Sequence, residues 1–200
     1  MTGGSTAAGG STTGSVPLGD AAAPGSPTIN PTSGYATVPA GAVTLSGYIS
    51  SSEGGSGSSI SLTCNAASFC AQGTVGASAT YNSWATVGFN VNQNQSGASG
   101  STSSLVLVGS TFSISYVNHA GSSLEFQLWD GSNYWCYYLP PATSPVTTTI
   151  PFSSLNTSCW DGKGTAFVSG TPVEIVQLTV PGSATTPTPF DYCFLGMTIQ

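Results

Sequence analysis

The sequence predicts an all-β fold, an antiparallel two-sheet β-sandwich for which a jelly roll is the favoured topology. Apolar and polar residues alternate with a period of two in many short stretches. Clusters of Gly, Ser, Asn, Asp and Pro separate these stretches, and no stretch carries a sustained apolar stripe of helical period. Many short strands at this spacing are typical of β-sandwiches and barrels.

The expected strands follow a long segment of low complexity. Residues 1–39 are rich in Gly, Ser, Thr and Pro, a composition typical of a flexible linker that buries too little apolar surface to order itself. We therefore expect a linker over 1–39 and a β-sandwich domain over 40–200. The expected strands are 43–50, 59–64, 85–93, 104–109, 111–118, 124–130, 134–139, 147–152, 173–181 and 191–199.

The composition excludes several classes of partner. Only 4% of the 200 residues are charged, the formal net charge is -6, and Lys163 is the only basic residue. Nucleic-acid binding is excluded because almost nothing can contact phosphates, and electrostatic attachment to a lipid surface fails for the same reason. No apolar run approaches the roughly 20 residues that span a bilayer, so no transmembrane segment is expected. This charge-poor composition favours an extracellular or cell-surface location, and we expect that a targeting segment was removed before Met1.

The five cysteines favour disulfides over a metal centre. They lack the spacing of a zinc site, and the chain has one histidine. In an extracellular protein, disulfides are the better interpretation. The heptapeptide "CNAASFC" predicts a small loop closed by Cys64 and Cys70. The pairing of Cys136, Cys159 and Cys193 stays open, with one of them left as a buried thiol.

Two of the expected strands carry polar side chains on the face opposite the core. In 85–93, this stripe includes a glycine that would let a ligand approach the backbone closely. In 124–130, the outward row is unusual for a solubilising surface, because an exposed Trp contributes nothing to solubility. The expected outward residues of these two strands are Thr86, Gly88, Asn90, Asn92, Glu125, Gln127 and Trp129.

Aromatic residues crowd the hairpin that follows. The turn "DGSN" contains Asp-Gly, which supplies the positive φ that a tight turn needs, and it returns the chain into 134–139. One of the two alternating sets in 134–139 must face the core. We expect Cys136 to lie on the core face, which places Trp135 and Tyr137 beside Trp129 on the outward face.

These outward residues predict a site for a sugar. A sugar ring offers an apolar C–H face to an indole and hydroxyl groups to amides and carboxylates, which fits an apolar platform with a few convergent polar groups. Amides without basic neighbours favour a neutral polysaccharide. The alternatives are that the two tryptophans cap the core under a loop and that Glu125 is an ordinary solvated strand residue. The predicted carbohydrate-binding residues are Trp129, Trp135, Asn90, Asn92, Glu125, Gln127 and Tyr137.

Catalysis is not expected, and a metal has little support. A glycosidase needs two carboxylates across the scissile bond, and Glu125 and Glu174 would share a cleft only if their strands were neighbours. His119 lies in a turn without an acidic partner, so no nucleophile triad is indicated. Asp191, with backbone carbonyls and a second carboxylate such as Glu53, could hold a structural Ca²⁺. The alternative for Asp191 is a bulge or turn residue.

Four stretches carry a resemblance to a known class of domain. They are "CAQGTVGASATYNSWATVGFNVNQNQ", "LEFQLWDGSNYWCYYL", "NTSCWDGKGTAF" and "IVQLTVPGSATTPTPFDYCFLGMTI". Together they make residues 43–200 resemble the jelly-roll carbohydrate-binding-module-like domains of bacterial secreted or lipid-anchored surface proteins. The resemblance implies an extracellular sugar-binding domain, and residues 3–15 are similar to the linker that follows a lipoprotein anchor. Members of this class often carry more acidic residues for calcium than this chain does.

The expected function is noncatalytic binding of a neutral polysaccharide. The alternative is a self-associating structural subunit of a cell-surface layer or filament. Charge depletion, an odd cysteine and flat Ser/Thr-rich strands such as 111–118 would suit lateral packing between copies.

Overall fold

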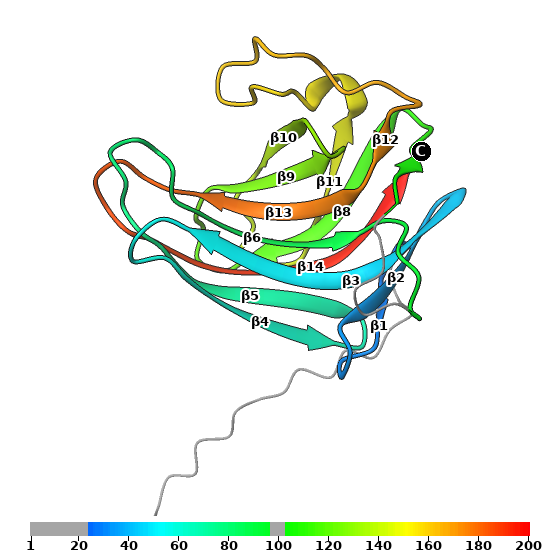
Figure 1. Ribbon diagram of the computed structural model, residues 1–200, viewed down its shortest axis with the longest axis horizontal. Coiled ribbons are helices and arrows are strands. Elements are labelled where there is room, and N and C mark those ends of the chain that lie inside the picture. Colours follow the sequence, from blue (N-terminus) through cyan, green and yellow to red (C-terminus); the bar gives the residue numbers. More distant parts are fainter. Residues whose placement is uncertain (1–23, 97–102) are drawn as a thin grey trace, which may run out of the picture.

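A computed structural model describes residues 24–96 and 103–200, and within these ranges the chain forms two antiparallel sheets packed face to face (Figure 1). The predicted β-sandwich is therefore confirmed. The larger sheet has the order β1 (Thr28–Ile29), β2 (Tyr35–Ala40), β3 (Val43–Gly54), β6 (Trp84–Asn90), β13 (Ile175–Pro181), β9 (Leu124–Trp129) and β10 (Tyr134–Leu139). The smaller sheet has the order β11 (Val146–Pro151), β8 (Thr111–Asn118), β14 (Thr188–Ile199), β5 (Ser68–Val75) and β4 (Ser59–Asn65). A separate ribbon pairs β7 (Leu105–Val106) with β12 (Pro172–Val173), and a 3-10 turn covers Phe152–Ser154.

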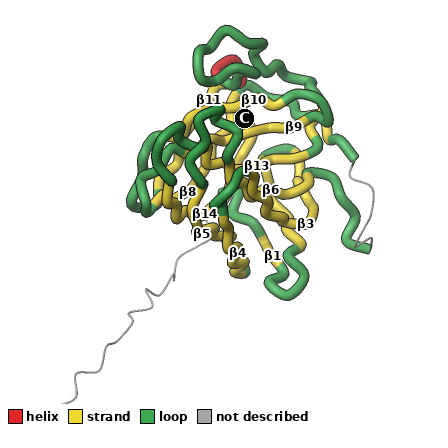
Figure 2. Tube along the Cα trace, turned by 60° about the vertical axis from the view of Figure 1, so that its left-hand side comes forward, coloured by secondary structure: helices red, strands yellow, loops and turns green. Residues whose placement is uncertain are grey.

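The chain crosses repeatedly from one sheet to the other, as in a jelly roll. It changes sheet between β3 and β4, β5 and β6, β8 and β9, β10 and β11, and β13 and β14. As a result, β13 lies between β6 and β9, and β14 lies between β8 and β5. Figure 2 shows the two layers from a second side. The last two long strands, β13 and β14, are therefore inner strands of the two sheets, and their neighbours come from distant parts of the sequence.

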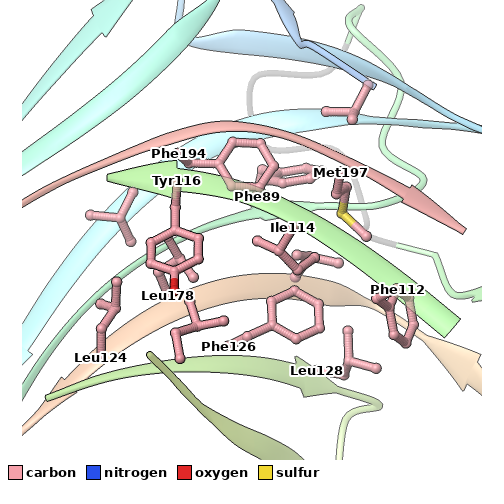
Figure 3. Packing of buried hydrophobic residues seen from close by; sticks show 14 of the residues in the cluster. Phe89, Phe112, Ile114, Tyr116, Leu124, Phe126, Leu128, Leu178, Phe194 and Met197 are labelled. Atoms are coloured by element: carbon pink, nitrogen blue, oxygen red, sulfur yellow. The ribbon is translucent and has the colours of Figure 1, made fainter. Parts of the chain in front are cut away.

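The space between the sheets is filled by the inward side chains of both layers (Figure 3). Phe69 and Phe194 stack with ring centroids 4.9 Å apart, and Phe89 from the larger sheet packs against both rings. At the other end of the core, Phe112 packs on Phe126 with centroids 5.4 Å apart. Because alternate residues of each strand are used in this core, the remaining side chains of the larger sheet form its outward face.

The folded region begins earlier than predicted. β1 and all of β2 except Ala40 lie within the stretch assigned to a linker, and Ala36 and Val38 of this stretch are buried in the core. The alternation in β2 is interrupted in sequence by Pro39, which lacks a backbone donor. The structure tolerates Pro39 because β1 pairs only with Ala36 and Thr37, so no N–H is needed there. The rest of the predicted linker, residues 1–23, lies outside the described residues.

The predicted disulfide between Cys64 and Cys70 is wrong. Cys64 lies opposite Phe69 in the β4–β5 hairpin and faces the core, whereas Cys70 is one residue further and faces outward. Cys70 instead bonds Cys193, its direct partner on β14. The second disulfide joins Cys136 to Cys159, which leaves Cys64 as the free thiol. Strand β5 is not among the expected strands, because the sequence predicts a disulfide loop over its first residues.

Of the other expected strands, 111–118 and 134–139 have the predicted bounds, and the rest are present with shifted ends. β6 stops at Asn90, β14 begins at Thr188, and the predicted strand 104–109 retains only β7. Within the described ranges, no helix is long and apolar enough to cross a membrane.

Candidate functional site

The outward face of the larger sheet forms a cleft of about 750 Å³. Its floor is contributed by β3, β6, β13, β9 and β10, five consecutive strands of the sheet. At a spacing of about 4.8 Å between strands, the cleft crosses about 19 Å of the sheet. Its volume lies in the range of ligand-binding clefts, about 300–1,000 Å³.

The strand register aligns polar side chains into two rows across this floor, because residues paired between neighbouring strands share a face. The first row contains Ser52, Thr86, Thr179, Glu125 and Tyr138. The second row contains Ser50, Gly88, Gln177, Gln127 and Cys136. Except for Tyr138, all of these residues line the cleft. The floor is therefore built mainly from hydroxyl and amide groups.

Exposed aromatic rings stand on both sides of the two polar rows. Trp84 is the next outward residue of β6 beyond the first row, and Tyr134 is the next outward residue of β10 beyond the second. Tyr81 and Trp160 reach the same cleft from loops, and each is 71% exposed. Aromatic side chains of this size are normally buried, so rings exposed around one cleft indicate a surface for ligand contact.

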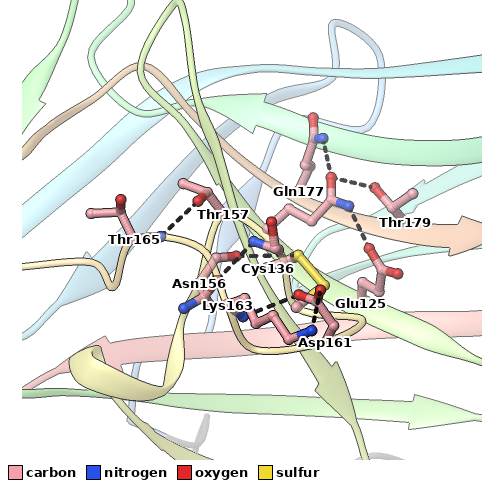
Figure 4. Close-up of a disulfide and its surroundings, with 12 residues drawn as sticks. Glu125, Cys136, Asn156, Thr157, Asp161, Lys163, Thr165, Gln177 and Thr179 are labelled. Carbon is pink, nitrogen blue, oxygen red and sulfur yellow. Dashed lines mark hydrogen bonds and ion pairs between the residues drawn. A yellow bond between two sulfur atoms is a disulfide. The ribbon is translucent and has the colours of Figure 1, made fainter.

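Hydrogen bonds between side chains fix the polar floor (Figure 4). The Nε2 atom of Gln127 donates to Oε2 of Glu125 at 2.6 Å. The Oε1 atom of Gln127 accepts from Nε2 of Gln177 at 2.7 Å and from the Thr179 hydroxyl at 3.0 Å. The Thr179 and Thr86 hydroxyls are 2.8 Å apart. Because these groups hold one another, the orientation of each side chain depends on that of its neighbours.

Glu125 is the only carboxylate among the described residues that line the cleft, and its side chain is buried. Burial raises the pKa of the Glu125 carboxyl, and hydrogen bonds from Gln127 and Tyr138 partly oppose that shift. Burial and the neighbouring Glu125 charge raise the pKa of Tyr138 to about 12, so its hydroxyl stays protonated at physiological pH. No basic side chain lines the described cleft.

The disulfide between Cys136 and Cys159 fastens a loop beside the cleft (Figure 4). The backbones of Cys136 and Asn156 exchange two hydrogen bonds, of 3.0 and 3.2 Å. Thr157 and Trp160 of this loop line the cleft. The loop after β11 is therefore held at the free edge of β10 by backbone hydrogen bonds and on the outward face of β10 by the disulfide.

Glu125 and Gln127 lie in the floor of the cleft, at neighbouring positions of the two polar rows. Trp129 lies on the same outward face, and its ring stacks on that of Tyr134 with centroids 4.1 Å apart. Trp129 itself does not line the cleft, and its contact with the cleft passes through Tyr134.

Neither Asn90 nor Asn92 lines the cleft, although Asn90 is paired with Ile175, which does. The Asn90 amide donates to Gln93 at 2.8 Å, and the Asn92 amide donates to the carbonyl oxygen of Ser104 at 3.2 Å. Both amide groups therefore form hydrogen bonds within the protein, and a contact of either with a sugar stays a prediction.

The predicted outward positions of Trp135 and Tyr137 are wrong. Trp135 is paired with Leu128, Tyr137 is paired with Phe126, and both side chains face the core. Trp135 is only 7% exposed and packs edge-on against Phe167, with ring centroids 5.4 Å apart. Because alternate residues face opposite ways, a wrong choice for one residue of a strand reverses all of them. The alternative in which a tryptophan caps the core under a loop is the correct one for Trp135.

The sequence interpretation missed four aromatic residues of the cleft, Tyr81, Trp84, Tyr134 and Trp160. Tyr134 was missed because its alternating set, which includes Cys136, was expected to face the core. Trp84 continues the outward stripe of Thr86 and Gly88 by one step, so extending the alternation backwards could have found it. Trp160 follows Cys159, and a tryptophan next to a disulfide-bonded cysteine is a weak signal for a fixed loop. Tyr81 lies in a loop at φ 56°, a conformation that the sequence does not indicate.

The predicted calcium ligands lie on different sheets. Asp191 is on β14 of the smaller sheet, and Glu53 is on β3 of the larger sheet. Among the described residues, the group of potential ligands within 4.8 Å of one another is Glu125, Cys136 and Cys159. Its two sulfur atoms form a disulfide, so they are not thiolate ligands. Calcium binding by Asp191 and Glu53 stays a prediction.

Comparison with known proteins gives matches among solved structures only: no family model and no curated protein matches the chain. One match is the family 11 carbohydrate-binding module of a cellulosomal cellulase from Clostridium thermocellum, with a TM-score of 0.47 and 13% identity over 74% of this chain and 87% of that chain. Another structure of that family from Clostridium thermocellum, in complex with a β-1,3-1,4-mixed-linked tetrasaccharide, has a TM-score of 0.43 and 14% identity over 76% of this chain and 91% of that chain. A family 4 module has a TM-score of 0.43 and 11% identity over 78% of this chain and 87% of that chain. The structural neighbours of the chain are thus carbohydrate-binding modules, and its own ligand has to be inferred from the cleft.

Proposed function

We propose that this domain binds a neutral polysaccharide without cleaving it, in the cleft on the outward face of the larger sheet. The observation that carries the proposal is the arrangement of two polar rows between exposed aromatic rings. Rings such as Trp84 and Trp160 can stack on the apolar C–H face of a sugar. The hydroxyl and amide groups of the floor can then bond the sugar hydroxyls.

The extent of the cleft supports a chain of linked sugars as the ligand. The lining residues cross five strands, about 19 Å, and aromatic rings are found on both sides of the floor. A single monosaccharide would contact only part of this surface. A polysaccharide segment would engage the polar rows and the aromatic rings together.

The charge of the cleft supports a neutral ligand. The formal net charge of the chain is -6, and the described lining contains Glu125 and no Lys, Arg or His. An anionic glycan would meet like charge and no cationic partner. A neutral glycan needs only hydrogen bonds and stacking, which the cleft can supply.

The carboxylates support binding without catalysis. Hydrolysis of a glycosidic bond requires two carboxyl groups roughly 5–9.5 Å apart on either side of the bond. Of the acidic residues in the described part of the chain, only Glu125 lines the cleft, and it is engaged by Gln127. The second carboxylate considered from the sequence, Glu174, is not part of the lining.

The disulfides support an extracellular setting for this binding. Cys70–Cys193 and Cys136–Cys159 are of the kind that persists in oxidising compartments. Polysaccharides of cell walls and matrices are available to a protein there.

Electrophoresis in native gels that contain a soluble polysaccharide tests the proposal. We expect at least one neutral polymer among hydroxyethylcellulose, xylan, galactomannan and laminarin to retard the protein, and polygalacturonate to leave its mobility unchanged. The control is the same protein in a gel without polymer. Retardation by polygalacturonate alone, or by no polymer, would refute neutral polysaccharide binding.

A further inference from the structure

The side chains of the cleft floor form a hydrogen-bond chain with a defined direction. Gln177 donates to Gln127, and Gln127 donates to Glu125. An ionised carboxylate can only accept hydrogen bonds, so the NH₂ group of Gln127 has to face Glu125. The carbonyl oxygen of Gln127 then faces Gln177 and Thr179, and both of these groups have to donate to it. The charge on one buried carboxylate thus determines the orientation of two amides.

We propose that Glu125 is a positioning residue whose charge state sets, through Gln127, which atoms Gln177 presents to a ligand, and that this makes binding of a neutral glycan depend on pH. With Glu125 ionised, Gln177 donates an N–H to the carbonyl oxygen of Gln127, and its own carbonyl oxygen stays available to a ligand in the cleft. The proposal rests on the proposed function for its ligand, but the relay of orientation between the two glutamines does not.

Protonation of Glu125 allows the direction of the hydrogen bonds from Gln177 through Gln127 to Glu125 to reverse. A carboxylic acid has an O–H that can donate to the carbonyl oxygen of Gln127. The Gln127 amide then turns over and directs its N–H groups at Thr179 and Gln177. Gln177 accepts with its own oxygen and turns its NH₂ group toward the cleft. When Glu125 is ionised, a sugar hydroxyl at this position meets the carbonyl oxygen of Gln177, which is an acceptor. When Glu125 is protonated, the same hydroxyl meets the NH₂ group of Gln177, which is a donor. Binding can therefore depend on pH although the ligand carries no charge.

The surroundings make Glu125 the group that changes charge in this floor. The Glu125 side chain is 6% exposed, and its burial raises the pKa of its carboxyl, so protonation sets in at a higher pH than for an exposed glutamate. From β10 it faces Tyr138, whose pKa is raised to about 12, and a cystine that does not titrate. β13 contributes Gln177 and Thr179, neither of which titrates. The remaining charged groups near this end of the sheet are the exposed pair Asp161 and Lys163 on the loop, and Asp130 and Glu174 beyond the aromatic row.

A ligand-free measurement tests the relay. The ¹³C signal of the Glu125 carboxyl and the side-chain amide signals of Gln127 and Gln177 are followed by NMR from pH 3.5 to 8. We expect all three to move with one common midpoint. In Glu125→Gln the two amides should no longer respond to pH, whereas Glu174→Gln should behave like the unmodified protein. Amide signals that stay fixed while Glu125 titrates would overturn the proposal.

A second variant tests the same coupling if Glu125→Gln does not fold. Tyr138→Phe retains the carboxyl and removes a hydrogen bond that favours its ionised form. The midpoints of Glu125, Gln127 and Gln177 should all move to higher pH together. A shift of Glu125 alone would show that the amides do not follow its charge.

A binding measurement then connects the relay to the ligand. The native gels with hydroxyethylcellulose and with xylan are run at pH values on either side of the NMR midpoint. Retardation should change at least threefold between them for the unmodified protein and should be independent of pH for Glu125→Gln. Equal retardation at both pH values, with the relay titrating, would refute the effect on binding. A titrating relay with no retardation by any polymer would refute the proposed function instead and leave the relay established.

Discussion

The disulfide between Cys136 and Cys159 joins the floor of the cleft to the loop that carries Trp160. Cys136 is a floor residue of β10, only 5% exposed, whereas Trp160 is one of the most exposed aromatic residues of the described chain. The crosslink therefore acts on the shape of the cleft as well as on stability.

Replacing both Cys136 and Cys159 by Ser should weaken polysaccharide binding and lower the free energy of unfolding. The closed loop spans a sequence separation of 23, so the stability loss should be about 3 kcal/mol by the loop-entropy relation. The matched control replaces Cys70 and Cys193, which close a separation of 123 on the other sheet and should cost about 5 kcal/mol. Titration calorimetry and urea unfolding measure both quantities. Unchanged affinity in the first variant would show that the loop does not contribute to binding.

Trp160→Ala should change the affinity for polysaccharide, whereas Trp135→Ala should change the stability of the fold. Trp160 is exposed at the cleft, so its truncation should weaken binding by about 1–3 kcal/mol without destabilising the fold. Trp135 packs in the core, so its truncation should cost about 3–5 kcal/mol of unfolding free energy and leave affinity unchanged in the molecules that fold. The same two methods separate these outcomes. A Trp160→Ala protein that binds like the unmodified chain would remove Trp160 from the site.

Gly88→Ala should disturb the cleft floor at Gln177. A Cβ atom at Gly88 would lie 2.6 Å from the Cβ atom of Gln177 and 2.8 Å from the carbonyl oxygen of Val176, so strand β13 has to shift at Gln177. We expect weaker binding with a stability loss of about 1–3 kcal/mol, as for other overpacked positions. Gly73→Ala is the control, because it crowds Ser59 on the smaller sheet and should reduce stability alone. Equal affinity of the Gly88 variant and the unmodified protein would argue against Gln177 as a ligand contact.

Glu125 should make stability fall as pH rises. Burial raises its pKa in the folded chain above the value of about 4.3 expected when unfolded, so the folded state binds the proton more tightly. That contribution is fully present below the unfolded pKa and is lost as pH rises through the folded pKa. Urea unfolding at pH 4 and pH 7 should therefore show the unmodified protein losing stability relative to Glu125→Gln. A difference between the two proteins that is constant, or that changes in the other direction, would contradict this.

The fold class could be predicted from the sequence because alternation in strands such as 111–118 and 124–129 directly reports a two-sided sheet. The orientation of 134–139 could not. Its two alternating sets are Tyr, Cys, Tyr and Trp, Tyr, Leu, so both are apolar enough for a core. The deciding contact is the disulfide from Cys136 to a residue 23 positions away, and the sequence left its partner open.

The polar rows of the cleft depend on which strands become neighbours. Gln127 and Gln177 lie 50 residues apart and meet only because β13 is inserted between β6 and β9. Alternation correctly placed Glu125 and Gln127 on the outward face, but it carries no information on register between distant strands. For the same reason, the role of Trp160, which lies on a loop, was not accessible from periodicity.

Depletion of the protein from solution by insoluble polysaccharides tests the central claim most directly. The panel consists of cellulose, xylan, mannan, β-1,3-glucan, chitin and peptidoglycan, and the unmodified protein is compared with the double variant Trp84→Ala, Trp160→Ala. We predict that at least one neutral polymer removes the unmodified protein and leaves the folded double variant in solution. Equal removal of both proteins would place binding outside the cleft. No removal by any polymer would contradict polysaccharide binding and favour the self-associating structural subunit.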